Sequence, residues 1–126
     1  MRPRPALALL ALPLALTACS EVAETAGRAG DCAGLVRDVA SAGLSGTPSV
    51  ADAEAAARRL DERVDEIGDT RLREAAGTLR DRVDALAAAA RSADAAAVQR
   101  AVDDARGAAR ETAELCGVPL DQLLGG

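Results

Sequence analysis

The stretch that decides the fold is residues 69–116, which read DTRLREAAGTLRDRVDALAAAARSADAAAVQRAVDDARGAARETAELC. Its apolar residues recur at alternating spacings of three and four, the period of an amphipathic helix that packs in a bundle. They are Leu72, Ala76, Leu79, Val83, Leu86 and Ala90, and then Val98, Val102, Ala105, Ala109, Thr112 and Cys116. The apolar stripe changes phase between Ala90 and Val98, and Ser92 and Asp94 are good N-cap residues. The stretch therefore predicts two helices, at 70–91 and 95–116.

One alternative remains open at this point, because neither Gly nor Pro marks the break between these two helices. A continuous helix over 70–116 would be about 70 Å long at 1.5 Å per residue. Such a rod would need a partner to bury its apolar stripe.

The same period continues toward the N-terminus. It predicts a helix at 50–67, with Ser49 and Asp52 resembling a capping box, and a shorter helix at 32–43 with Asp31 as its N-cap. The apolar faces are Ala53, Ala57, Leu60, Val64 and Ile67 in the longer helix, and Cys32, Leu35, Val36, Val39 and Ala40 in the shorter one. No alternating, strand-like run occurs in the chain. The sequence thus predicts an all-α fold, a small antiparallel four-helix bundle of up-down-up-down topology with a short first helix.

Two cysteines, Cys32 and Cys116, fall at the start of the first predicted helix and at the end of the fourth. In an up-down-up-down bundle these places lie at the same end, on neighbouring helices. We predict a disulfide between them, worth about 4 kcal/mol for a loop of about 80 residues. The alternatives are two buried thiols or a weak two-cysteine metal site, which would have no His to complete it.

The N-terminus has the features of an export signal. Arg2 and Arg4 precede an apolar stretch at 6–16, which is shorter than the roughly 20 residues that a membrane-spanning helix needs. The stretch ends in Leu16-Thr17-Ala18-Cys19, which resembles the lipobox of bacterial lipoproteins. The resemblance covers this N-terminal segment alone.

The resemblance implies that the chain is cut before Cys19 and that the Cys19 sulfur carries a diacylglyceryl group. Residues 1–18 would be the signal peptide, 19–30 the lipidated cysteine with a flexible tether, and 31–126 the bundle domain. The protein would be held on the extracytoplasmic face of the cell membrane. The alternative is an ordinary secreted protein cut near Ala18, with an incidental Cys19.

The composition excludes several classes of function. The chain has no His, Lys or aromatic residue, which removes the usual nucleophile triads, Schiff-base chemistry, imidazole metal sites and base-stacking platforms. After residue 18 it carries 13 arginines against 20 acidic residues, a formal charge of −7, which argues against nucleic-acid binding. We expect no enzymatic activity, no cofactor and no metal. The use of Arg without Lys, with 32 Ala residues, suggests a GC-rich source such as an actinobacterium.

Acidic residues cluster at three places: Asp61, Glu62, Asp65 and Glu66; Asp81 and Asp84; and Asp103 and Asp104. Paired carboxylates are typical of sites for hard cations. However, arginines are interleaved with each cluster, which favours solvated helix faces with ion pairs between neighbouring turns. We expect these clusters to form such ion-paired helix faces and not cation sites.

The sequence predicts a role for the mature domain only in outline. We expect a structural or protein-interaction module of the cell envelope that binds an envelope protein, and self-association is a third hypothesis. A carrier of a lipid or other apolar ligand between the helices is the alternative. The apolar C-terminal segment 118–124 either folds back over the open end of the bundle or serves as a docking peptide.

Overall fold

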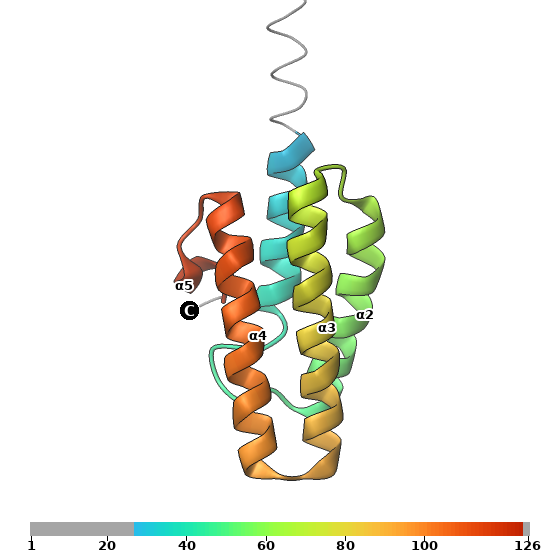
Figure 1. The fold of residues 1–126 in the computed structure, drawn as a ribbon, viewed down its shortest axis with the longest axis vertical. Coiled ribbons are helices and arrows are strands. Elements are labelled where there is room, and N and C mark those ends of the chain that lie inside the picture. The colour runs from blue at the N-terminus through green and yellow to red at the C-terminus, as the bar shows by residue number, and fades with distance from the viewer. Residues whose placement is uncertain (1–26, 125–126) are drawn as a thin grey trace, which may run out of the picture.

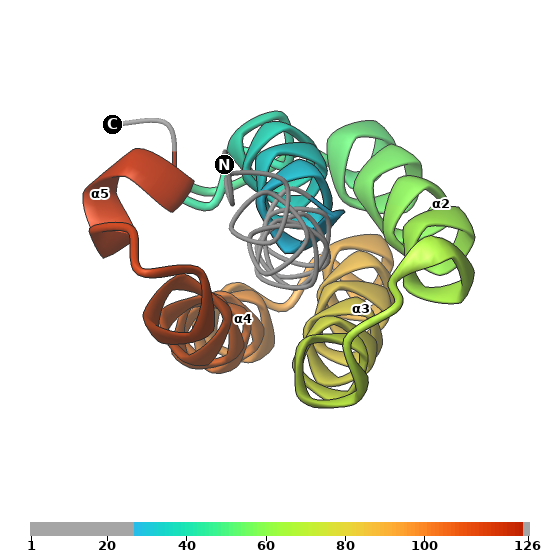
Figure 2. The same cartoon turned by 90° about the horizontal axis from the view of Figure 1, so that it is seen from above.

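A computed structural model describes residues 27–124. Four main helices pack antiparallel, each beside the next in the chain, and a short fifth helix follows (Figure 1). The bounds are residues 27–40 for the described part of the first helix, and then α2 Val50–Glu66, α3 Thr70–Ser92, α4 Ala95–Cys116 and α5 Leu120–Leu123. Viewed from above, the four main helices surround a common core (Figure 2). The predicted all-α, four-helix bundle is confirmed.

Side-chain caps begin the three long helices where the sequence predicts. The Ser49 hydroxyl accepts a hydrogen bond from the Asp52 backbone N–H at 3.1 Å, and the Asp69 carboxylate accepts one from Leu72 at 2.9 Å. The Asp94 carboxylate accepts from the N–H groups of Ala96 and Ala97. Each cap satisfies donors that a helix N-terminus leaves without a partner.

The break between α3 and α4 is real, so the continuous helix over 70–116 is excluded. Ala93 adopts the left-handed conformation, with φ 57°, and Asp94 then caps α4. A left-handed residue ends a helix whatever its type, although Gly is favoured there because it has no Cβ. This explains why the break carries no Gly in the sequence.

The predicted bounds of the first helix, 32–43, are wrong at both ends. The helix already includes residue 27, so residues 27–30 are not part of a flexible tether, and it ends at residue 40. Asp31 is therefore not its N-cap; its carboxylate instead accepts a hydrogen bond from the Gly68 N–H at 3.4 Å. The turn that follows the helix contains Gly43 with φ 76°, and the Arg106 side chain donates to the Leu44 carbonyl there at 2.6 Å.

The core consists of fully buried leucines and β-branched residues separated by alanines. The alanines have small side chains, which allow the helices to approach closely. The largest side chains with almost no exposed surface are Leu35, Val39, Leu44, Leu60, Ile67, Leu72, Leu79, Val83, Leu86, Val102, Thr112 and Leu123. Most of the predicted stripes are buried. Ala40, Ala90, Val98 and Cys116, near helix ends, are partly exposed, and so is Val36 in the middle of the first helix.

The predicted disulfide joins Cys32 of the first helix to Cys116 at the end of α4, with their Cα atoms 5.7 Å apart. The chain then turns through left-handed Gly117 and folds back into α5. Leu123 of α5 is completely buried. The segment lies along the flank of α4, however, and not over the end of the bundle (Figures 1 and 2).

The predicted signal peptide, residues 1–18, and Cys19 lie outside the described residues. Within residues 27–124, none of the helices is both long enough and apolar enough to cross a bilayer. The disulfide indicates an extracytoplasmic location, because such bonds form and persist in oxidising compartments.

Candidate functional site

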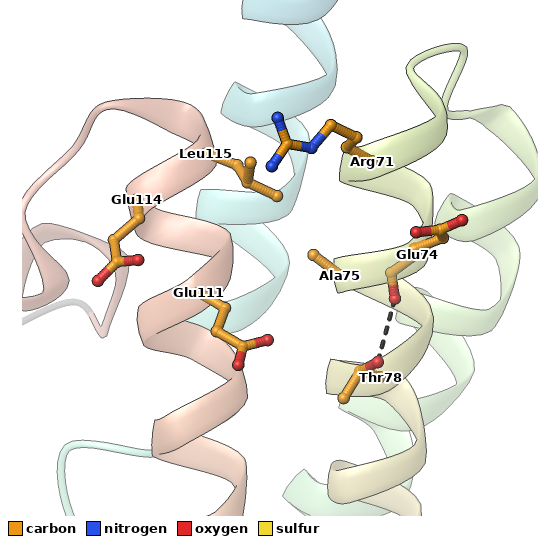
Figure 3. Close-up of a pocket in the computed structure, with 7 residues that line it drawn as sticks. All are labelled: Arg71, Glu74, Ala75, Thr78, Glu111, Glu114 and Leu115. Atoms are coloured by element: carbon orange, nitrogen blue, oxygen red, sulfur yellow. Dashed lines mark hydrogen bonds between the residues drawn. The ribbon is translucent and has the colours of Figure 1, made fainter.

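A groove runs along the surface between α3 and α4. One section of about 450 Å³ is lined by Arg71, Glu74, Ala75 and Thr78 from α3 and by Glu111, Glu114 and Leu115 from α4 (Figure 3). A second section of about 240 Å³ shares Thr78 and Glu111 and continues to Arg82, Asp103, Asp104, Gly107 and Ala108. We call these residues the α3–α4 groove.

The groove exists because alanine, glycine and threonine, which have small side chains, occupy positions on α3 and α4 that line it. Ala75 and Ala108 come from helix positions beside the core, and Gly107 has open space where a Cβ would stand. The Thr78 hydroxyl donates to the Glu74 carbonyl of its own helix at 3.2 Å (Figure 3). The hydroxyl is thereby engaged within α3.

Charged side chains form the walls of the groove, with five carboxylates against two guanidinium groups. In Figure 3 the Arg71 guanidinium lies near Leu115 between the two helices, while the Glu114 carboxylate points away from α3. Glu111 and Glu114 are exposed to solvent. Exposed carboxylates of this kind attract cations weakly, and they lack the apolar enclosure that ligand pockets usually have.

The seam between α2 and α3 is different because ion pairs cross it. Arg91 of α3 pairs with Glu54 of α2 at 2.9 Å, and Arg80 of α3 pairs with Asp61 of α2 at 3.3 Å. Arg80 also contacts Asp81 at 3.2 Å. Asp61 and Asp81 are thus both paired with Arg80, one across the seam and one between adjacent residues, and no ion pair between neighbouring turns of one helix is formed among the described residues. Among the described residues, no group of three or more metal-ligating side chains comes together.

One charged site inside the bundle was missed by the sequence analysis. The Asp38 side chain is only 9% exposed, and its Oδ2 lies 2.6 Å from the Arg63 Nε of α2. This hydrogen bond is the main cause of the raised pKa of Arg63. Gly34 leaves room for the Arg63 guanidinium, because a Cβ there would collide with it. The signal was available: Gly34 and Asp38 are four residues apart, so they share a face of the first helix.

Comparisons with protein-family models, with curated proteins and with solved structures found no match to this chain.

Proposed function

We propose that the protein is a cell-envelope lipoprotein, anchored through Cys19, whose helical bundle is a non-enzymatic structural or protein-interaction module on the outer face of the membrane. The observation that carries this proposal is the pairing of Cys32 with Cys116. The pair indicates export, and it leaves Cys19 as the third of three cysteines, at the end of a lipobox-like segment. Two acyl chains on Cys19 would give stable anchoring, which a single chain does not.

The filled core supports an interaction module over a carrier of apolar ligands. Leucines from the first helix, α2 and α3 meet in the middle of the bundle with no exposed surface, for example Leu35, Leu60 and Leu79. The α3–α4 groove, in turn, is lined largely by charged side chains. A carrier needs a continuous apolar cavity, and the α3–α4 groove with its charged walls does not have that lining.

The proposal is tested by the variant Cys19→Ala in the full-length chain. We expect the wild type to fractionate with membranes and to incorporate a labelled fatty acid, and the variant to lose both properties. Cys116→Ser is the matched control, because it removes a cysteine without touching the lipobox-like segment, and it should stay in the membrane fraction. A Cys19→Ala variant with unchanged membrane retention and unchanged mature mass would contradict the proposal.

Separate experiments test the carrier hypothesis and the self-association hypothesis. Titration of the soluble fragment 20–126 with a fluorescent fatty acid should give no saturable binding if the bundle is an interaction module.

Sedimentation of the same fragment over a range of concentrations tests self-association, and a monomer at all concentrations would count against it.

A further inference from the structure

The first helix is fastened to the rest of the bundle near the beginning of its described part. The Arg28 guanidinium donates to the Leu115 carbonyl of α4 at 2.9 Å, and its other terminal nitrogen lies 3.7 Å from the Asp69 carboxylate. Asp31 accepts from the Gly68 N–H, and Cys32 is bonded to Cys116. Within residues 28–32 the chain is thus tied to the end of α4 and to the turn between α2 and α3. We call residues 28–32 the collar.

The collar lies at one end of the molecule. The start of the first helix, the α2–α3 turn and the end of α4 come together there, while the α3–α4 turn lies at the opposite end (Figure 1). The two ends are separated by the length of α3, whose 23 residues span about 35 Å.

Chain length limits how far this end can stand from a lipid anchor. Gly27 follows Cys19 by eight residues, which span at most about 29 Å when fully extended. This limit is shorter than α3 itself. If Cys19 carries the anchor, the collar end therefore stays within that distance of the lipid surface.

Charge opposes an arrangement in which the bundle lies on α2. This helix carries six carboxylates against three arginines, and the chain after residue 18 has a net charge of −7. Membranes rich in anionic lipid repel such a flank. The α3 helix carries five arginines against three carboxylates, so equal energy transfer in the test below is the outcome expected for a bundle that lies on α3. Residues 41–51, which include the loop at the other end of the first helix, contain no charged side chain.

We infer that the collar end is the surface that faces the lipid headgroups, and that the opposite end, with loop 41–49 and the turn at 93–94, points away from the membrane. The inference rests on the proposed anchoring through Cys19. The collar contacts hold the first helix to α4 and to the α2–α3 turn, so the bundle moves as one body with the collar. The outward end is then the part of the surface that an envelope partner can reach.

The test compares dyes at the two ends of the lipidated full-length protein in vesicles of phosphatidylethanolamine and phosphatidylglycerol. One dye is attached at Thr70→Cys, beside the collar end, and the other at Ala96→Cys, near the outward end. Both positions are exposed, and labelling without reductant leaves the Cys32–Cys116 bond intact. We expect energy transfer to a headgroup-labelled lipid to be several-fold stronger from position 70. Equal or stronger transfer from position 96 would overturn the inference.

Two further arms separate the collar from the anchor. Arg28→Ala combined with Cys32→Ser and Cys116→Ser should reduce the difference between the two dyes, whereas Arg37→Ala, an exposed arginine of the same helix, should leave it unchanged. If the two variants change the difference in energy transfer equally, the collar does not control the orientation of the bundle. If a Cys19→Ala chain binds the vesicles as well as the wild type, the anchoring proposal itself fails.

Discussion

At the scale of single residues, the effect of replacing a helical glycine depends on the side chains around it. Gly34 and Gly107 both lie in helices. Helix propensity alone predicts that replacing either one by Ala stabilises the protein. Their surroundings differ: a Cβ at residue 34 would meet the Arg63 guanidinium, while a Cβ at residue 107 meets nothing within 4 Å.

We predict that Gly34→Ala destabilises the protein by about 1–3 kcal/mol, because displacing Arg63 leaves the buried Asp38 carboxylate without its partner. Gly107→Ala, the matched change, should stabilise it by about 0.5–1 kcal/mol. Urea unfolding of both variants measures the difference. Equal effects of the two changes would contradict this account of Gly34.

Asp69 gives the clearest expectation for pH. The Leu72 N–H donates to its carboxylate, and Arg28 lies nearby, so the pKa of Asp69 is lowered from its ordinary value. A lowered folded-state pKa gives a stabilisation that is fully present above the ordinary Asp pKa of about 3.9 and is lost as the pH falls through the lower folded value. Thermal unfolding of Asp69→Asn, which keeps a capping side chain without the charge, should show a shallower loss of stability in this acidic range. A wild type and variant with parallel acid profiles would count against this role.

At the scale of elements, the helices were predicted best where their boundaries depend on local signals. The caps at Ser49, Asp69 and Asp94 act within three residues, and the structure has all three. The first helix was predicted least well. Asp31, its predicted N-cap, lies inside the helix and accepts from Gly68, and the Leu44 carbonyl after the helix accepts from Arg106, so both contacts involve residues remote in sequence.

The left-handed Ala93 gives a prediction at this scale. Its positive φ strains a residue that carries a Cβ, and Gly relieves that strain. We expect Ala93→Gly to raise the free energy of unfolding by up to about 1 kcal/mol. Ala88→Gly, an exposed position inside α3, should lower it by about the same amount. Differential scanning calorimetry separates the two signs, and a destabilised Ala93→Gly would refute the left-handed break.

At the scale of the whole molecule, the disulfide closes a bundle with a thin core. Many core positions are Ala, which buries little apolar area, so cross-linking makes a large contribution to stability. We predict that reduction lowers the free energy of unfolding by about 2–5 kcal/mol. Urea unfolding with and without reductant measures it, and the double variant Cys32→Ser, Cys116→Ser should match the reduced protein and ignore reductant. An unchanged free energy of unfolding on reduction would show that the disulfide does not stabilise the bundle.

The sequence by itself determined the three long helices, their caps, the topology and the cysteine pairing. The reason is that apolar period and capping are local, and two cysteines in the bundle allow a single pairing. Only the tertiary structure decided the Asp38–Arg63 pair, the place of α5 along α4, and the capture of the Leu44 carbonyl by Arg106. These contacts join residues as far as 25 and 62 positions apart, so they depend on how the helices pack and leave no periodic trace in the chain.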